Sequence, residues 1–242
     1  MKAKLTTSRA AVFVLLTVVG VVALSMAQRR PREDTSPSQP RDADEGTLQW
    51  HARRARAKGL QEITIPTPRW RITGAANLDE ALNQFSVVLA KPVEEKSFIW
   101  SPYNIRTWYK FKVREFLSQR DWPTCDVCPA PPGAPADLLP LKRDEILIVR
   151  AGGTAVVDGV RITSVDSAFP PFSRGQEYLL FVKLNRADRV GEITMSHYGV
   201  FTVDEGGVRQ LNNRSHPFAA ELTAHGNRVL EFVRAKIAEH RR

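Results

Sequence analysis

The only two cysteines of the chain, Cys125 and Cys128, lie three positions apart within residues 121–133, DWPTCDVCPAPPG. Thiols at this C-x-x-C spacing can form a redox couple, supply half of a metal site or close a local disulfide. A redox couple requires a helix that begins at the pair and lowers the thiol pKa. Pro123 precedes the pair and Pro129 follows it directly. A helix cannot continue through such a segment, so the helix that a redox couple requires is not expected here.

The further residues that a metal site or a haem site would need beside this pair are also missing. A c-type haem site has His directly after the second cysteine, where this chain has Pro129, and a zinc site requires two further ligands. The histidines are scattered, without an H-x-x-x-H pair: His51, His197, His216, His225 and His240. We therefore expect a local disulfide between Cys125 and Cys128, with no metal and no cofactor. Free or metal-bound thiols and a redox couple stay open as alternatives.

Sequence motifs of enzymes are missing from the chain. It has no G-x-S-x-G, Walker loop, H-E-x-x-H or G-x-G-x-x-G sequence. Gly152 and Gly153 stand between two predicted strands, and we interpret them as a turn or bulge rather than a phosphate cradle, because no helix follows to bind an anion. Four aspartates lack the spacing of a calcium loop: Asp121, Asp126, Asp137 and Asp144. The sequence therefore predicts a protein that is not an enzyme.

Aromatic residues gather around a predicted strand at 107–114. Trp100 and Tyr103 precede this strand, and Trp108 and Tyr109 lie within it. Core packing accounts for such a cluster, but flat aromatic faces at the rim of a β-barrel also bind sugars or peptides. The candidate binding surface is therefore the aromatic segment 98–109, with these four residues as its candidates, together with the Pro-rich loop within 119–140.

The first 27 residues have the pattern of an export signal. Basic residues up to Arg9 precede an apolar run from Ala10 to Leu24, and Ser25-Met26-Ala27 fits a signal-peptidase site. A helix of this run spans roughly 22 Å, less than the ~30 Å hydrocarbon core of a bilayer. An uncleaved membrane tether through residues 10–27 is the alternative. In both cases we expect an exported body that is periplasmic, secreted, or membrane-tethered and facing outward.

The charge balance is basic. The chain has 35 Lys and Arg against 26 Asp and Glu, and without residues 1–27 the net charge is 32 − 26 = +6. This charge favours adhesion to anionic surfaces such as lipid headgroups or cell-wall polymers, although an Arg-rich soluble surface has the same balance. We expect no nucleic-acid partner for an exported chain.

Two short helices and a disordered linker are predicted before the strands. Residues 28–46 are charged and rich in Pro and Ser, which is typical of a linker. A basic helix is predicted at 47–58, ended by Gly59, and a second helix at 77–83, capped by Asn77.

Strands dominate the middle of the chain. The strand at 107–114 has Lys110, Lys112 and Arg114 on one face, which predicts that this face is exposed. Hairpins are predicted at 154–165, around Asp158-Gly159, and at 198–211. The remaining predicted strands are 85–90, ended by Lys91-Pro92, 145–149, 178–182 and 192–195. A single amphipathic helix is predicted at 215–242, opened by Ser215 and Pro217, and expected to pack over one end of the sheet.

Many short strands with helices only at the ends predict a mainly β fold. We expect a small antiparallel β-barrel of the OB-like type, with a short N-terminal helix and a C-terminal amphipathic helix. The expected division is a signal peptide or anchor at 1–27, a linker at 28–46, an extension at 47–76, a β-barrel domain at 77–214 with a Pro-rich insertion at 119–140, and the C-terminal helix at 215–242.

Four segments in this order, TWYKFKVREFL, DEILIVRAGG, FPPFSRGQEYLLFVKL and HYGVFTVDEGG, resemble a group of uncharacterised secreted bacterial proteins. More distantly, the chain is similar to the netrin-like and tissue-inhibitor-of-metalloproteinase barrels of the OB type. The likeness covers roughly residues 84–212 and consists of strands and glycine turns. The inhibitor family acts through an N-terminal cysteine, which this chain lacks near its predicted mature start, so the likeness does not imply inhibition.

These observations predict an exported, non-enzymatic β-barrel domain that binds a protein or a cell-envelope polymer. An envelope thiol oxidoreductase working through Cys125 and Cys128 is the alternative from another class. A peptidase inhibitor is a further alternative, by fold analogy alone.

Overall fold

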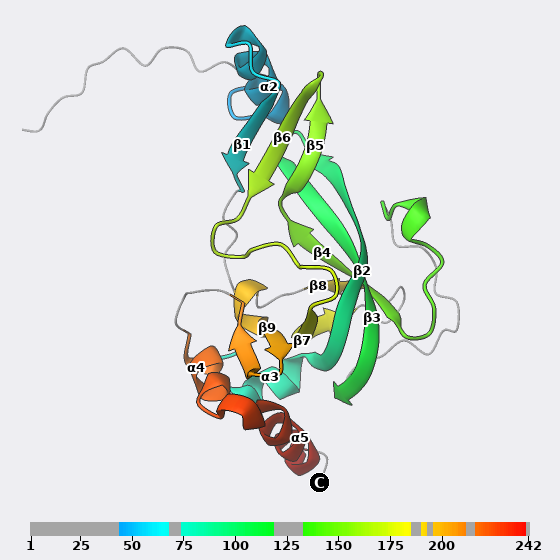
Figure 1. Ribbon diagram of the computed structural model, residues 1–242, viewed down its shortest axis with the longest axis vertical. Helices are drawn as coiled ribbons and strands as arrows, with labels where there is room; N and C mark the ends of the chain where they lie inside the picture. Colours follow the sequence, from blue (N-terminus) through cyan, green and yellow to red (C-terminus); the bar gives the residue numbers. More distant parts are fainter. Residues whose placement is uncertain are drawn as a thin grey trace, which may run out of the picture. The chain divides into compact units, whose positions relative to one another are not determined.

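The computed structural model describes residues 44–67, 74–118, 133–184, 190–192, 196–211 and 216–240. They belong to one unit, Asp44–Arg242, which contains two sheets and several helices (Figure 1). No helix among the described residues is long and apolar enough to cross a membrane. The predicted export signal and both cysteines lie outside these residues.

The larger sheet has the strand order β10-β9-β7-β2-β3-β4-β8. Neighbouring strands are antiparallel, except β4 and β8, which are parallel. β8 also pairs with the end of β7. The bounds are β2 Ser86–Ser101, β3 Asn104–Ser118, β4 Glu145–Ala151, β7 Glu177–Leu184, β8 Val190–Glu192, β9 Val200–Asp204 and β10 Gly207–Gln210. The predicted strands at 145–149 and 178–182 and the hairpin at 198–211 are confirmed.

β2 and β3 form a hairpin much longer than the sequence predicts. The expected end of the first strand at Lys91-Pro92 is wrong, because β2 continues to Ser101. β7 pairs only with Ser86–Ala90, and the register between β2 and β3 shifts just after Pro92. Proline is tolerated at such an irregular position on a strand that has a neighbour on one side only.

A second, three-stranded sheet has the order β1-β6-β5, with β1 Glu62–Pro66, β5 Gly153–Val157 and β6 Val160–Val165. The predicted hairpin between β5 and β6 is confirmed: Asp158 and Gly159 have φ of +48° and +80°, as a type I′ turn requires. β1 comes from the segment 47–76, expected as an extension, and pairs parallel with β6.

The predicted basic helix is confirmed as α2, Leu48–Ala57. The Oγ1 of Thr47 accepts a hydrogen bond from the Trp50 N–H at 3.1 Å, which caps the first turn. The helix packs on the three-stranded sheet through the buried side chains of Leu48, Ala52 and Ala55. Its arginines remain exposed.

The chain passes from one sheet to the other at Gly152 and Gly153, where the predicted turn or bulge is confirmed by φ of +91° and +133°. A Cβ on Gly153 would overlap the Oγ1 of Thr107 and lie 2.5 Å from the Oγ of Ser97. These two hydroxyls are hydrogen-bonded at 2.9 Å, and Thr107 also donates to the Gly152 carbonyl at 2.8 Å. Glycine is therefore required for the close approach of β5 to the β2–β3 hairpin.

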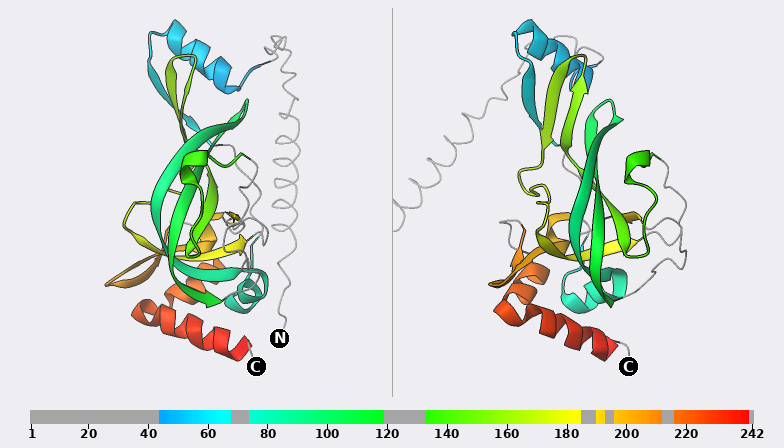
Figure 2. Two further views of the ribbon diagram at one scale, coloured as in Figure 1. Left: turned by 90° about the vertical axis from the view of Figure 1, so that its right-hand side faces the viewer. Right: turned by 45° about the vertical axis from the view of Figure 1, so that its right-hand side comes forward.

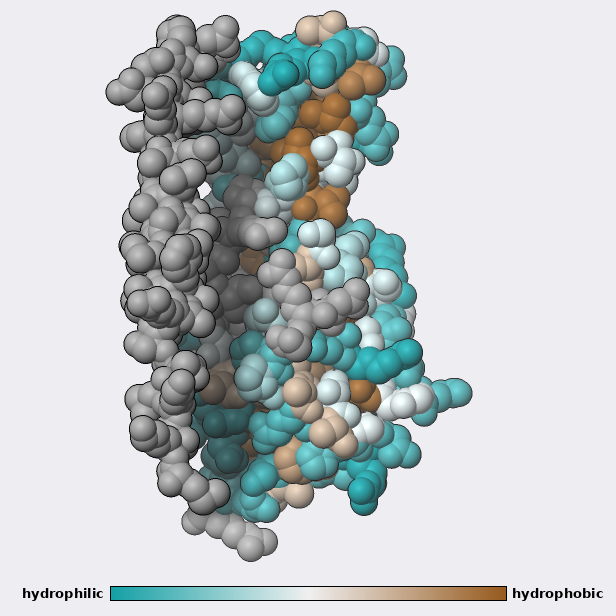
Figure 3. Space-filling view, turned by 90° about the vertical axis from the view of Figure 1, so that its left-hand side faces the viewer, coloured by the Kyte–Doolittle hydropathy of each residue, from teal (hydrophilic) through white to brown (hydrophobic). Residues whose placement is uncertain are grey.

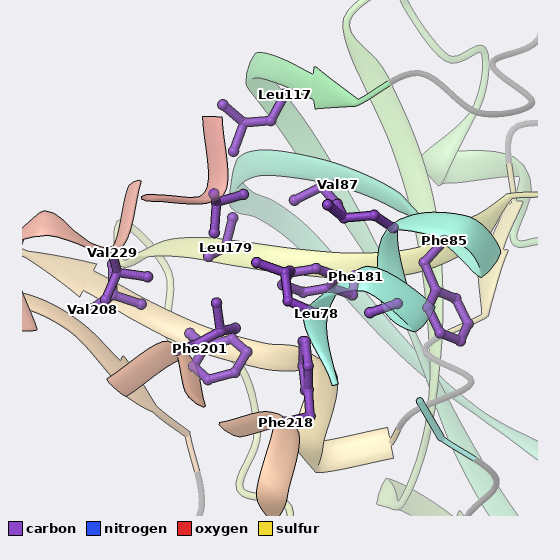
Figure 4. Packing of buried hydrophobic residues seen from close by; sticks show 14 of the residues in the cluster. Leu78, Phe85, Val87, Leu117, Leu179, Phe181, Phe201, Val208, Phe218 and Val229 are labelled. Carbon is purple, nitrogen blue, oxygen red and sulfur yellow. The ribbon is translucent and has the colours of Figure 1, made fainter. Parts of the chain in front are cut away.

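Helices α3 Leu78–Gln84, α4 Pro217–Thr223 and α5 Val229–His240 pack around the largest hydrophobic cluster of the described residues (Figure 4). In it, the ring of Phe218 meets those of Phe181 and Phe201 edge-on, at centroid distances of 4.9 and 5.9 Å. The predicted cap of α3 is confirmed, because the Oδ1 of Asn77 accepts from the Glu80 N–H at 2.9 Å.

The prediction of a single C-terminal helix at 215–242 is wrong. A 3-10 turn, Gly226–Arg228, separates α4 from α5, and Gly226 has φ of +54°. A residue in this left-handed region ends an α-helix. The residue at the start of α4 is His216, and the predicted cap, Ser215, lies outside the described residues. The apolar face still packs over the sheet as predicted, with Leu222, Val229, Val233 and Ile237 buried.

The predicted mainly β fold with antiparallel sheets and terminal helices is confirmed. The finer prediction, a closed OB-like barrel, is not confirmed: the larger sheet runs from β10 to β8 and carries a separate three-stranded sheet beside it. Two further 3-10 helices, η1 Ala136–Leu138 and η2 Ser196–Gly199, lie in the connections.

Candidate functional site

The turn between β2 and β3 exposes a group of large side chains. Ile99, Trp100 and Tyr103 are 46%, 48% and 50% exposed, and Pro102 between them is also exposed. We call these four residues the hairpin tip. Large apolar side chains are normally scattered singly on a surface, so their concentration at one turn indicates a contact surface.

Two contacts orient Trp100. The guanidinium carbon of Arg106 lies 4.1 Å from the centroid of the Trp100 ring, and Phe98 meets the ring edge-on at 5.9 Å. Arg106 is directly opposite Phe98 in the β2–β3 register. The indole is therefore held by a cation–π contact and an aromatic neighbour, which lowers the entropy it would lose on binding.

The hairpin tip adjoins the N-terminus of α2. The Leu48 N–H donates to the Pro102 carbonyl at 2.7 Å, and Ile105 belongs to the same buried cluster as Leu48. Figure 2 shows the end of the β2–β3 hairpin and α2 in the same part of the molecule. This contact brings the arginines of α2 into the neighbourhood of the tip.

The candidate surface predicted from the sequence is only partly a surface. Trp100 and Tyr103 are exposed as required, but Trp108 and Tyr109 are 3% and 2% exposed. The prediction that these two residues belong to the surface is wrong, because β3 lies in the middle of the sheet and both of its faces are covered. Trp108 packs against Leu138, Leu141 and Leu147. Tyr109 belongs to the cluster on the opposite face.

The face of β3 that carries Lys110, Lys112 and Arg114 was predicted to be exposed. For Lys110 this prediction is wrong. Lys110 is buried, and its Nζ lies 3.5 Å from the Glu94 carboxylate. The segment around η1 covers this face, and Lys96 donates to Asp137 of η1. That hydrogen bond holds the pKa of Asp137 below its ordinary value. Lys112 and Arg114 are exposed as predicted.

The one large pKa shift among the described residues lies in the interior, at Tyr109. Burial raises the pKa of Tyr109 to about 12 and lowers the pKa of Arg150. Arg150 donates to the backbone carbonyl of Phe169 and lies over the ring of the same residue. Arg150 and Tyr109 therefore contribute to the packing of the 166–172 connection.

A second exposed apolar area lies on the three-stranded sheet. Figure 3 shows hydrophobic side chains gathered at the height of this sheet. Val156 is 64% exposed and Val165 is 42% exposed. Both belong to strands that alternate between this face and the one covered by α2. Strands β5 and β6 contain no aromatic residue, so this area lacks the tryptophan and tyrosine rings found at the hairpin tip.

Within the described part of the chain, no three His, Cys, Asp or Glu side chains are grouped as a metal site. Cys125 and Cys128 lie outside it, so their predicted disulfide stays a prediction.

Ile99 and Arg106 lie within the predicted segment 98–109, but sequence reasoning did not single them out. A signal for Arg106 was present in the strand alternation, which places it on the same face as Trp108 and opposite Phe98. Using this pattern requires knowing how far β2 extends, and Pro92 wrongly suggested that the strand ends there.

No protein-family model matches the chain, and a search of curated proteins finds no match either.

Proposed function

We propose that the chain is an exported, non-enzymatic binding domain whose hairpin tip contacts a protein or a polymer of the cell envelope. One observation supports this function above the others: Trp100 and Tyr103 stand half-exposed on a turn that the β2–β3 hairpin and α2 hold in place. Tryptophan and tyrosine supply a large contact area at a small cost in conformational entropy, and they are enriched where proteins bind their partners.

The electrostatics support binding over catalysis. A catalytic acid or base needs a shifted pKa at a place that a substrate can reach. The one large shift among the described residues lies at Tyr109, which is buried, and Arg150, whose pKa is lowered by burial, is buried as well. At the tip, the cation Arg106 rests on Trp100, and the exposed arginines of α2 add positive charge. Such a surface favours a ligand that combines apolar or ring faces with negative charge.

We also infer that five strands form the small OB-like barrel expected from the sequence. β7, β2, β3, β4 and β8 each pair with the next, and β8 pairs with β7 as well as β4. Hydrogen exchange tests this closure. The amides of Val190–Glu192 should be protected nearly as well as those of β4, and exchange at the rate of a free peptide would contradict a closed barrel.

The proposed function is tested by native electrophoresis in gels that contain envelope polymer extracted from the host. The polymer should retard the wild-type chain, and Trp100→Ala with Tyr103→Ala should remove most of the retardation. Val156→Ser is the matched control, because Val156 is an exposed apolar residue on β5 that is not one of the four tip residues, and its substitution should leave the retardation unchanged.

A protein ligand is tested separately, with a photoreactive amino acid at position 103 or 156. An adduct in the host envelope that forms from position 103 and is competed by unlabelled wild type, but not by Trp100→Ala/Tyr103→Ala, supports a protein partner. If the double variant is retarded like wild type and position 103 gives no competed adduct, the hairpin tip is not the contact surface.

A further inference from the structure

The point where the described chain begins lies at the hairpin tip. Asp44 accepts a backbone hydrogen bond from Thr47 at 3.0 Å, and the next residue, Leu48, is bonded to the Pro102 carbonyl. Residues 1–43, which include the apolar run of residues 10–27, are therefore joined to the domain beside its exposed aromatic turn.

We propose that the hairpin tip and α2 together dock on an anionic lipid surface. This inference rests on the proposed function, because it uses the same tip as a contact surface. The proposed ligand of the hairpin tip is the lipid headgroup layer, rather than a protein or a polysaccharide.

The composition of the tip fits a bilayer interface better than a sugar surface. Tryptophan and tyrosine concentrate at the headgroup level of membranes, where a ring is apolar and its N–H or O–H stays hydrated. Ile99 adds a branched aliphatic side chain, which can enter the acyl boundary but offers no flat face to a sugar. All three side chains are about half-exposed and stand within five positions of the chain.

The backbone polar groups of the hairpin tip should cost little to transfer from water to a bilayer interface. Proline has no N–H, and the Pro102 carbonyl already accepts a bond from Leu48. The Tyr103 N–H donates to the Ser101 Oγ at 3.3 Å. Polar groups with partners inside the protein cost less to move into a low-dielectric boundary than groups bonded to water.

Positive charge flanks the apolar group. Residues 48–58, LQWHARRARAK, carry four cations and no carboxylate. Asp44 is paired with Arg53, and Asp158 lies 3.5 Å from Arg56, while Arg54 rests on Trp50. Arg106 adds a cation at the tip itself. A Lys or Arg near an anionic leaflet strengthens binding by roughly five-fold, and salt screens this term.

The tether would keep the tip close to the membrane. The sequence predicts a linker at residues 28–46, and a flexible chain of about 16 residues has a mean reach of about 20–24 Å. If residues 10–27 stay in the bilayer, such a reach would raise the effective concentration of the lipid surface where the chain enters the domain, next to the hairpin tip. If they are cleaved, the same surface binds peripherally and more weakly.

The test uses the full chain as it is recovered from the host, mixed with vesicles whose lipids carry bromine near the headgroup. Residues 10–27 contain no tryptophan, so quenching of tryptophan fluorescence reports on the rest of the chain. With about 30% phosphatidylglycerol in a phosphatidylcholine vesicle, we expect quenching that falls in ~0.5 M salt. Trp100→Phe should remove a large part of the quenched signal, and Trp50 of α2 should account for the remainder.

Two further variants separate docking from unfolding. Ile99→Ser with Tyr103→Ser keeps the Trp100 reporter but removes apolar area, and should reduce quenching to the value found with phosphatidylcholine alone. Val156→Ser should leave quenching as in wild type. Equal quenching on neutral and anionic vesicles, or full quenching of the Ile99→Ser/Tyr103→Ser chain, overturns the inference.

The lipid-free gel assay and the cross-linking assay distinguish this failure from a failure of the proposed function. If vesicles do not quench Trp100 while envelope polymer still retards wild type through Trp100 and Tyr103, only the lipid inference falls. If the tip variants change none of these assays, the tip is not a contact surface and both proposals fall.

Discussion

Arg150 and Phe169 contact each other twice. The guanidinium of Arg150 donates to the backbone carbonyl of Phe169, and its central carbon lies 4.9 Å from the centroid of the Phe169 ring. Arg150 is the next-to-last residue of β4, just before the chain changes sheets, and Phe169 lies in the connection that leads from β6 to β7. The pair therefore ties a long connection to the place where the two sheets meet.

The first prediction concerns this pair. Arg150→Met should lower the free energy of unfolding by about 2–4 kcal/mol, because it breaks a buried charge-assisted hydrogen bond and leaves the Phe169 carbonyl without that donor. Phe169→Leu keeps the carbonyl and most of the apolar volume but removes the ring. A double-mutant cycle in urea should give a coupling of about 0.5–2 kcal/mol.

Arg161→Met is the control for loss of an arginine, because Arg161 is exposed on β6. Its effect should stay within about 0.5 kcal/mol. Strictly additive effects of the Arg150 and Phe169 substitutions would show that the ring contact contributes nothing.

A second prediction follows from the raised pKa of Tyr109, about 12 in the folded chain, with burial as the main cause. The unfolded value is about 10, so the folded state holds this proton more tightly. The associated stability is fully present below pH 10 and is lost as the pH rises through 12. Over that window the loss should be about 2–3 kcal/mol.

Urea denaturation at a series of alkaline pH values checks this result. Tyr109→Phe should be less stable than wild type at neutral pH, because it gives up the hydrogen bonds of the hydroxyl. It should lose less stability between pH 9 and 11 than wild type does, since the group that titrates is gone. Parallel pH curves for the two proteins would mean that Tyr109 ionises as easily folded as unfolded.

A third prediction concerns the crossing between the sheets. Gly153→Ala combines a positive φ with overlap against Thr107 and Ser97, and should cost about 3–4 kcal/mol of unfolding free energy. Gly159→Ala has a positive φ but no atom within 4 Å of the added Cβ, so it should cost only about 1–2 kcal/mol. Equal costs at the two positions would show that β5 does not approach the β2–β3 hairpin so closely.

Local patterns in the sequence predicted the elements that local chemistry determines. The cap at Asn77 and the Asp158-Gly159 turn are examples, since each depends on a few neighbouring residues. The continuation of β2 through Pro92 was not predictable in this way. It depends on which strands lie beside β2, and no local pattern contains that information.

The candidate site shows the same limit. Four aromatic residues were predicted as a surface, and their spacing cannot tell a rim from a core. Trp108 and Tyr109 are buried because η1 and the 166–172 connection cover the two faces of β3, and these coverings come from distant parts of the chain. Trp100 and Tyr103 are exposed because they flank a turn, which only the length of the hairpin reveals.

A fourth prediction tests this division of the aromatic residues. Trp108→Ala should lower the free energy of unfolding by about 3–5 kcal/mol, as expected for a large side chain removed from a core. Trp100→Ala should cost no more than about 1 kcal/mol, the size of its contacts with Arg106 and Phe98. Urea denaturation followed by circular dichroism measures both, and a large cost for Trp100 would mean that the hairpin tip belongs to the folded core.

The last prediction concerns the export and oxidation state of the chain. Intact-mass analysis of protein from the host envelope and medium, with and without reduction, should show loss of residues 1–27 and the loss of two hydrogens at Cys125 and Cys128. Alkylation should add two groups only after reduction. Reduction should lower the unfolding free energy by at most about 2 kcal/mol, because a disulfide over so short a loop restricts the unfolded chain little.

The same experiment separates this expectation from the thiol alternative. Free or mixed-disulfide cysteines in freshly recovered protein, together with a depressed thiol pKa and catalysis of insulin reduction, would favour an oxidoreductase over a binding domain. Cys125→Ser/Cys128→Ser is the matched variant. It should bind vesicles and envelope polymer like wild type if the hairpin tip acts as proposed, because neither cysteine belongs to that surface. An uncleaved N-terminus would identify the tethered form, in which the tip is held within reach of the bilayer.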